Sequence, residues 1–170
     1  MTLKNVLKLT GCVVLTLAVG GISGFITSSE INGWYATLVK PGFNPPNWIF
    51  GPVWTLLYFL MGVALYMLIA NAPSKERRAG ILIFAAQLFL NFWWSIIFFS
   101  FHRLDLALGE IGLLWLFILW MIIVLFRQKP VAGYLMIPYL LLPIEFLSLI
   151  VNSNMHFSLF GVFTHSNLLK

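Results

Sequence analysis

The sequence contains very little charge. Of its 170 residues, only 9% are Asp, Glu, Lys or Arg, and 61% are hydrophobic. A soluble domain carries about 25% charged residues, so this chain lacks the polar surface that a water-soluble globular protein needs. The composition excludes that class and predicts a single integral membrane domain over residues 1–170, with the lipid bilayer as its surroundings.

Residues typical of catalysis and metal binding are scarce as well. Cys12 is the one cysteine, which excludes an intrachain disulfide. The histidines, His102, His156 and His165, fall in predicted loops or the tail, so no pair can supply two axial haem ligands within a bundle. No Cys/His cluster has metal-ligand spacing, and no phosphate-binding glycine loop or nucleophile elbow occurs. We therefore expect no enzyme with ordinary catalytic residues, no metal and no covalently bound cofactor.

The chain has instead a series of long apolar runs. A helix needs about 20 apolar residues to cross a bilayer, and five runs meet this requirement, at about 9–29, 48–70, 80–101, 106–126 and 131–151, before a tail at 152–170. The runs are continuous and do not alternate, which favours helices over a β-barrel. The predicted fold is an all-α bundle of five transmembrane helices. The alternative for the first run, a secretory signal peptide after Lys4 and Lys8, lacks a clean cleavage site.

Positive charge is distributed unevenly between the loops. With five spans, the N-terminus, the second loop and the fourth loop share one side, and they carry seven of the ten Lys and Arg residues. The opposite side has Lys40, Arg103 and Lys170. The positive-inside rule then predicts a cytoplasmic N-terminus and an external C-terminus in a cell (inner) membrane. The net charge of +5 is a signal of topology, and we expect no nucleic-acid partner.

The connection between the first two runs, at about 28–47, is rich in proline and aromatic residues. Its prolines restrict the backbone and its aromatic rings supply apolar surface that a solvated loop does not need. These residues are Pro41, Pro45 and Pro46 together with Trp34, Tyr35 and Phe43. Two interpretations remain open: an aromatic belt at the lipid headgroups, or a lid that closes over a cavity.

Two pairs of residues at helical spacing lie next to this connection. Trp54 and Tyr58 are four residues apart and share a face of the second run, which is either core or the wall of a ligand cavity. Gly20 and Gly24 are also four apart, in the first run. Small residues at this spacing let helices approach closely, either within the chain or in a dimer.

Polar side chains occur inside three of the later runs. Gln87 and Asn91 are four residues apart with Trp94 close by, and they predict either an interhelical hydrogen-bond clamp or the polar anchor of an apolar cavity. Glu110 is expected to be a structural partner of these amides or of loop backbone. Glu145 lies near the middle of the fifth run, where a carboxylate is a candidate functional group.

Several short motifs occur in an order and spacing that resemble the TspO/MBR family, the tryptophan-rich translocator proteins. They are WY at 34–35, KP at 40–41, PP at 45–46, GPVW at 51–54, LY at 57–58, QL at 87–88, then Asn91, Trp94 and PY at 138–139. The resemblance covers about residues 10–150. It implies a five-helix bundle, commonly a homodimer, with a pocket roofed by the first loop. It also implies binding of porphyrins such as protoporphyrin IX or haem, or of sterol-like small molecules.

The resemblance also implies a set of ligand-binding residues. The first loop contributes a lid, the second span a wall, and the third span the side opposite. The candidates are Trp34, Tyr35, Phe43, Pro45, Trp54, Tyr58, Gln87, Asn91, Trp94, Leu142 and Glu145. Leu142 stands where the family usually has Trp, and no basic residue follows Tyr139 closely, so the family's sterol motif is missing.

The function that follows is a membrane receptor or sensor for a tetrapyrrole or a similar apolar ligand. A transporter that moves this ligand across the bilayer is the first alternative. Light- and oxygen-dependent degradation of the bound porphyrin is the second.

Overall fold

The computed structural model describes residues 2–38, 46–141, 143 and 146, and all regular secondary structure in this part of the chain is helical. The all-α prediction is therefore confirmed. The elements are α1 (Leu3–Asn32), α2 (Trp34–Thr37), η1 (Asn47–Ile49), α3 (Phe50–Ile69), α4 (Lys75–Ser95), η2 (Ile96–Ser100) and α5 (Leu104–Gln128), followed by the helix Pro130–Leu141.

Four segments are long and apolar enough to cross a membrane: Leu3–Asn32, Asn47–Ile69, Lys75–Ser100 and Leu104–Gln128. They correspond to the first four predicted spans, with the ends of the second and third differing by one residue, so the protein is an integral membrane protein. Of the fifth span, the described residues include the shorter helix Pro130–Leu141. The complete fifth span stays a prediction, and so does the lid, because residues 39–45 lie outside the described part.

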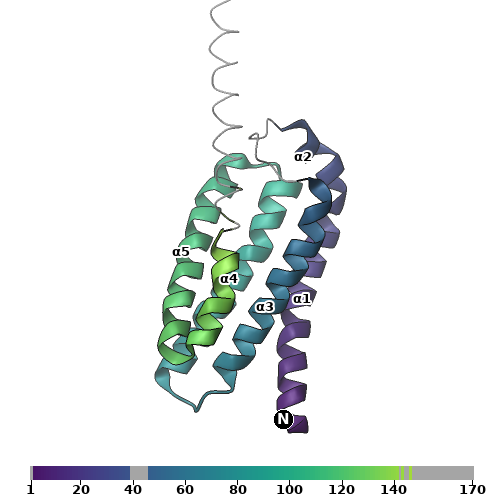
Figure 1. Ribbon diagram of the computed structural model, residues 1–170. Helices are drawn as coiled ribbons and strands as arrows, with labels where there is room; N and C mark the ends of the chain where they lie inside the picture. Colours follow the sequence, from purple (N-terminus) through teal and green to yellow (C-terminus); the bar gives the residue numbers. More distant parts are fainter. Residues whose placement is uncertain (1, 39–45, 142, 144–145, 147–170) are drawn as a thin grey trace, which may run out of the picture.

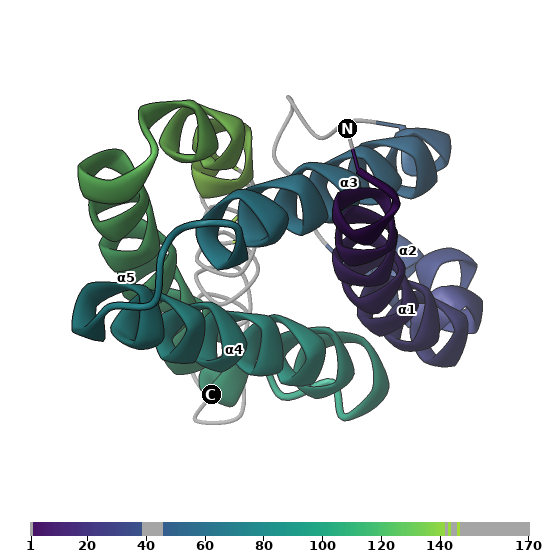
Figure 2. The ribbon, with the colours of Figure 1, turned by 90° about the horizontal axis from the view of Figure 1, so that it is seen from below.

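The long helices run side by side (Figure 1). The N-terminus and the α3–α4 turn lie at one end of the bundle, and α2 lies at the other end with the α4–α5 turn. Viewed along the bundle, α1, α3, the Pro130–Leu141 helix, α5 and α4 follow one another around a common centre (Figure 2). In this arrangement α3 and α4 each face the interior from opposite sides.

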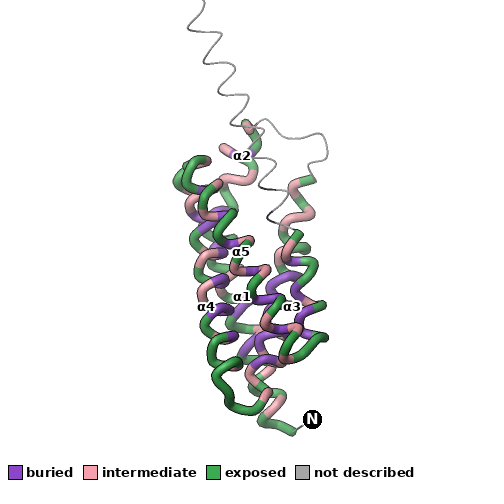
Figure 3. The backbone as a smooth tube through the Cα atoms, turned by 90° about the vertical axis from the view of Figure 1, so that its left-hand side faces the viewer, coloured by how far each residue is buried: buried purple, intermediate pink, exposed green. Residues whose placement is uncertain are grey.

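Apolar side chains cover the outer faces as well as the core. Buried positions concentrate where helices face one another, and exposed positions face outward (Figure 3). Large exposed residues such as Phe25, Leu82, Phe89 and Leu116 suit a surface in contact with lipid. Half of the apolar stretch in Lys75–Ser100 is buried, against 17% of that in α1, so the α4 segment packs against its neighbours more extensively than α1 does.

Gly62 brings α1 and α3 into backbone contact. A Cβ added at Gly62 would lie 2.6 Å from Val13 Cα and 2.7 Å from Thr16 Oγ1. The Thr16 hydroxyl donates a hydrogen bond of 2.8 Å to the Tyr58 carbonyl at this crossing. Because any larger residue would separate the helices, Gly62 sets how closely they approach, as small residues do between transmembrane helices.

The two glycines of α1 have different surroundings. A Cβ at Gly20 would overlap the Tyr58 ring, so Gly20 packs within the chain. A Cβ at Gly24 would meet no atom within 4 Å. The interpretation of Gly20 as an intrachain packing site is confirmed, whereas a dimer contact at Gly24 stays a prediction.

Candidate functional site

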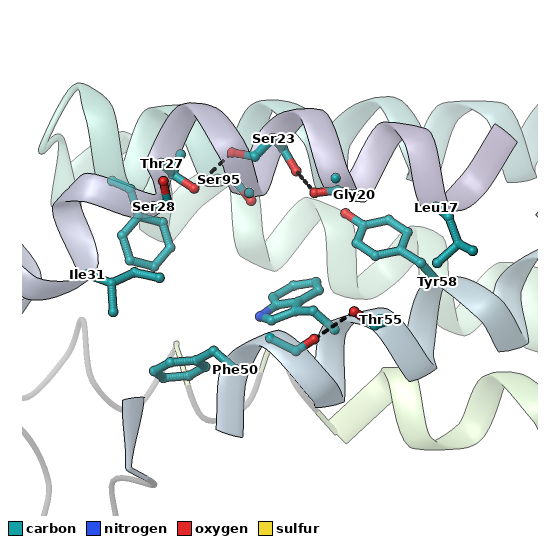
Figure 4. A pocket seen from close by; sticks show the side chains of 15 residues that line it. Leu17, Gly20, Ser23, Thr27, Ser28, Ile31, Phe50, Thr55, Tyr58 and Ser95 are labelled. Atoms are coloured by element: carbon teal, nitrogen blue, oxygen red, sulfur yellow. Dashed lines mark hydrogen bonds between the residues drawn. The ribbon is translucent and has the colours of Figure 1, made fainter. Parts of the chain in front are cut away.

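A cavity of about 350 Å³ lies between α1 and α3, beyond the crossing at Gly62 and toward the α2 end of the bundle (Figure 4). Residues from α4 and η2 also line it. The lining consists of Leu17, Gly20, Gly21, Ser23, Gly24, Thr27, Ser28, Ile31, Phe50, Gly51, Trp54, Thr55, Tyr58, Ser95 and Phe99. The cavity is therefore formed mainly where two helices that touch at Gly62 have separated.

The two walls of the cavity differ in shape and chemistry. The α1 wall carries small residues, among them Gly20, Gly21 and Gly24. The Tyr58 ring covers Gly20, whereas an added Cβ at Gly21 or Gly24 would meet nothing within 4 Å, so the helix backbone is open to a ligand at these two positions. The α3 wall is aromatic: Trp54 and Tyr58 stack with ring centroids 5.8 Å apart and an interplanar angle of 29°. A slot between a wall of rings and a wall of glycines suits a flat apolar molecule.

Hydroxyl groups give the slot a polar edge. Ser23 donates to the Gly20 carbonyl at 3.1 Å, and Thr27 donates to the Ser23 carbonyl at 2.8 Å. Ser28 and Thr55 likewise donate to carbonyls of their own helices. Because these hydroxyl protons are used within the helices, the oxygens retain lone pairs with which to accept hydrogen bonds.

Tyr58 connects the cavity to a buried polar cluster. Its hydroxyl donates to Asn91 Oδ1, and Asn91 Nδ2 donates to the Tyr139 hydroxyl. Asn91 and Tyr139 are each 1% exposed. Of the interhelical clamp predicted for Gln87 and Asn91, the part at Asn91 is thus present, and it joins α3, α4 and the Pro130–Leu141 helix.

Gln87 and Trp94 lie in the interior beside this cluster rather than in the lining of the cavity. Gln87 is fully buried, and neither atom of its amide has a hydrogen-bond partner among the described residues. Trp94 stacks on Phe98 at 5.2 Å and meets Phe146 edge-on at 4.5 Å. The ring centroid of Phe146 also lies 6.4 Å from that of Trp54. This aromatic cluster therefore packs against the wall of the cavity that contains Trp54.

Trp34 belongs to α2, at the end of the bundle that also contains the α4–α5 turn. Its ring stacks on His102 with centroids 4.3 Å apart, and His102 Nε2 lies 3.2 Å from Glu30 Oε2. His102 has φ 54°, a left-handed backbone conformation that is unusual outside glycine, and its imidazole contacts Glu30 of α1 and Trp34 of α2. Beside it, the hydrogen bonds of Arg103 to the Asp105 carboxylate raise the pKa of the guanidinium.

Tyr35 lies behind the cavity wall. It is 1% exposed and packs against Phe50 at 5.8 Å and Phe99 at 5.7 Å, both of which line the cavity. Phe99 reaches this position from the π-helical η2, where Phe101 N–H donates to the Ile96 carbonyl five residues back. A π-helical turn of this kind is common at functional sites.

The structure therefore places the sequence candidates in three groups. Trp54 and Tyr58 line the cavity, whereas Trp34, Tyr35, Gln87, Asn91 and Trp94 surround it or lie deeper. Phe43, Pro45, Leu142 and Glu145 lie outside the described residues.

The sequence interpretation did not identify the polar edge on α1. Ser23, Thr27 and Ser28 are spaced as residues of one helix face, but the first run contains small residues throughout, and these indicate helix packing as readily as a site. Within residues 2–38 and 46–141, no group of three His, Cys, Asp or Glu side chains could hold a metal ion.

Comparison with known proteins agrees with this architecture. The model of the TspO/MBR family matches residues 12–149. The "Tryptophan-rich protein TspO" of Chlorobaculum tepidum is 41% identical over 138 residues, which are 81% of this chain and 87% of the relative. A protein of the same name from Archaeoglobus fulgidus is 40% identical over 136 residues, covering 80% and 88%. The "Translocator protein" of Sus scrofa is 32% identical over 128 residues, covering 72% and 76%. The chain therefore belongs to the TspO/MBR family.

Proposed function

We propose that the protein is a membrane receptor that binds a flat, apolar ligand of the tetrapyrrole class, such as protoporphyrin IX or haem, in the cavity between α1 and α3. The observation that carries the proposal is the slot itself: the ring of Trp54 lines one wall, and the other wall includes Gly21 and Gly24 of α1, where an added Cβ would meet nothing within 4 Å. A planar ring system can stack on Trp54 while its other face approaches the helix backbone at Gly21 and Gly24.

The polar groups of the slot fit a ligand that is mostly apolar. Hydroxyl oxygens at its edge can accept hydrogen bonds, and the described residues that line it include no Lys, Arg or His. A ligand with charged substituents therefore has to direct them out of the slot, toward the end of the bundle where His102 and Arg103 lie. Pockets of this size with a few polar groups are typical of small-molecule sites.

A direct test is titration of the full-length protein in lipid nanodiscs with protoporphyrin IX. The quenching of tryptophan fluorescence measures the binding. We expect micromolar affinity, which corresponds to about −8 kcal/mol. Empty nanodiscs are the control, because they report how much of the porphyrin partitions into the lipid alone. Quenching that is no stronger than in empty nanodiscs, or that does not saturate, would contradict the proposal.

Transport of the ligand across the membrane is the second candidate. It is favoured by exposed residues in the lining, Gly21, Gly24, Ser28 and Thr55, which open the slot sideways between α1 and α3. A ligand dissolved in the bilayer can enter by that route. Uptake of protoporphyrin IX into proteoliposomes, compared with equilibrium binding, distinguishes a transporter from a receptor. Assembly into a homodimer belongs to the same proposal and rests on the family.

A further inference from the structure

Positive charge gathers at the end of the bundle opposite the α2 end. This end contains the N-terminus, the α3–α4 turn and the turn between α5 and the Pro130–Leu141 helix (Figure 1). Among the described residues here, Glu76 is the one acidic residue, whereas the exposed basic residues are Lys4, Lys8, Lys75, Arg78, Arg127 and Lys129. The end therefore has a large excess of positive charge in contact with its surroundings.

Two hydrogen bonds of Gln128 fasten the end of α5 to the beginning of α4. The Gln128 Nε2 donates to the Glu76 carbonyl at 3.0 Å, and its Oε1 accepts from Asn71 Nδ2 at 3.4 Å. The two helices also pack closely at this level, because a Cβ added at Gly80 would lie 3.3 Å from Gln128 Nε2. We call this place the α4–α5 junction. It holds together two helix ends that both carry cations.

Four exposed cations flank the junction. They lie one or two positions from the bonded residues Glu76 and Gln128, and they are Lys75, Arg78, Arg127 and Lys129. Neither of the two ion pairs found in the described part of the chain includes any of them. The Glu76 side chain interacts with Ser74 and with its own backbone N–H instead. Since like charges repel, an anion bound at the junction would relieve their repulsion.

The surface beside the junction indicates that this anion belongs to a lipid. The turn after α5 is held by the Lys129 carbonyl, which accepts from the Ala132 N–H at 2.9 Å. Beyond it, Tyr134 is 63% exposed and meets Phe126 edge-on, with ring centroids 4.9 Å apart. An exposed tyrosine near the ends of membrane-spanning helices is typical of the headgroup region. A phospholipid can contact both the cations and this apolar surface, whereas a free phosphate can use the cations alone.

We propose that the α4–α5 junction binds an anionic phospholipid, whose phosphate is held by Lys75, Arg78, Arg127 and Lys129 and whose acyl chains lie along the outer faces of the helices. Polybasic clusters next to membrane spans attract anionic lipids. Here the hydrogen bonds of Gln128 fix the two helix ends in place, so the cations need little reorganisation to bind one headgroup. The site lies away from the cavity between α1 and α3, and it does not depend on the proposed function.

The first experiment is native mass spectrometry of the full-length protein in a non-ionic detergent, titrated with phosphatidylglycerol or with zwitterionic phosphatidylcholine of the same acyl chains. We expect the first phosphatidylglycerol to bind about tenfold more tightly, since each basic residue near an anionic surface contributes about fivefold at low salt. Higher salt should reduce the preference by screening. Equal affinity for the two lipids would overturn the proposal.

Paired substitutions locate the site. The double variant Arg127→Gln with Lys129→Gln should lower the preference for phosphatidylglycerol about fivefold, and so should Lys75→Gln with Arg78→Gln. Lys4→Gln with Lys8→Gln is the matched control, because it removes the same charge from the same end of the bundle but lies on α1. The control should keep the preference. An equal loss in all three variants would refute a local site, and an unchanged preference in either junction variant would refute the shared site.

Gln128→Leu tests the organisation of the junction, because it removes both hydrogen bonds and no charge. We expect the affinity for phosphatidylglycerol to fall at least about twofold while phosphatidylcholine binds as before. An unchanged affinity in a folded variant would show that the junction plays no part. If this variant does not fold, the charge variants still decide the proposal, since their side chains are exposed.

A competition experiment distinguishes a lipid from a soluble phosphate. Glycerol 3-phosphate carries the phosphate without acyl chains, and in large excess it should leave phosphatidylglycerol bound. Its displacement of the lipid would overturn the assignment to a phospholipid. In nanodiscs, phosphatidylglycerol should raise the unfolding temperature of the unmodified protein and of the α1 control more than that of the junction variants, because a ligand of the folded state stabilises it. The same rise in all of them would contradict the proposal.

Discussion

Tyr58 of α3 packs directly against Gly20 of α1, and the ring occupies the space that a Cβ at position 20 would take. The same tyrosine lines the cavity and donates a hydrogen bond to Asn91. The contact therefore joins the α1 wall of the slot to the polar interior. Because the Tyr58 hydroxyl is held by Asn91, the ring cannot move away freely when position 20 becomes larger.

Gly20→Ala should consequently lower stability by about 1–3 kcal/mol, the usual cost of an overpacked site, and should weaken protoporphyrin binding by displacing Tyr58. Gly11→Ala is the matched control, since a Cβ at Gly11 of the same helix meets nothing within 4 Å. Thermal unfolding and fluorescence titration of both variants measure the two effects. Equal stability of the two variants would refute this account of the contact.

Gly62→Ala should be at least as damaging as Gly20→Ala. The added methyl group would meet backbone atoms of Val13 and the Thr16 hydroxyl, and backbone yields less readily than a side chain. We expect a loss of about 1–3 kcal/mol together with a wider separation of α1 and α3. A disulfide or spin-label pair across the two helices reports the separation. Gly112→Ala on α5, which has nothing within 4 Å, should leave both properties unchanged.

Trp54→Ala should weaken binding of protoporphyrin IX by roughly 1–3 kcal/mol, the contribution of a large apolar side chain. Trp54 stands in the aromatic wall of the cavity. Trp120→Ala is the control, because Trp120 is 53% exposed on α5 and faces away from the bundle interior. Wild-type affinity in Trp54→Ala would remove this residue from the site.

The distribution of Lys and Arg among the loops predicts the membrane topology. Alkaline phosphatase fused after Lys170 should be active, and the same enzyme fused beside Lys75 should be inactive, because seven of the ten Lys and Arg residues lie on the side assigned to the cytoplasm. Activity assays in whole cells, with immunoblots for expression, measure this directly. The reverse pattern would overturn the orientation and leave the helices unchanged.

Light-driven degradation of bound porphyrin should be slow. By its resemblance to the family, the chain has Leu142, outside the described residues, where a tryptophan is expected in the fifth helix. Trp54 is the one tryptophan among the described residues that line the cavity. We expect Leu142→Trp to bleach protoporphyrin faster than the unmodified protein at equal occupancy. Absorbance decay under constant illumination measures both rates. Rapid bleaching by the unmodified protein, with no acceleration in the variant, would contradict the prediction.

The apolar runs and the spacing of short motifs determine much of this protein without its coordinates. Continuous runs that lack charge can only be helices in a bilayer, since every backbone group must be hydrogen-bonded internally. Four of the predicted spans are present as helices, and motifs such as GPVW at 51–54 and LY at 57–58 indicate the TspO/MBR family to which the chain belongs. Helical spacing also placed Trp54 and Tyr58 on one face, and both line the cavity.

Tertiary structure decided which neighbour each face meets. Periodicity shows that Gln87 and Asn91 share a face of α4, but not that Asn91 reaches Tyr58 and Tyr139 while the cavity edge comes from Ser23 and Thr27 of α1. The order of helices around the bundle and the close approach at Gly62 set these contacts. They arise between segments far apart in the sequence, and a local pattern carries no information about the partner that packs against it.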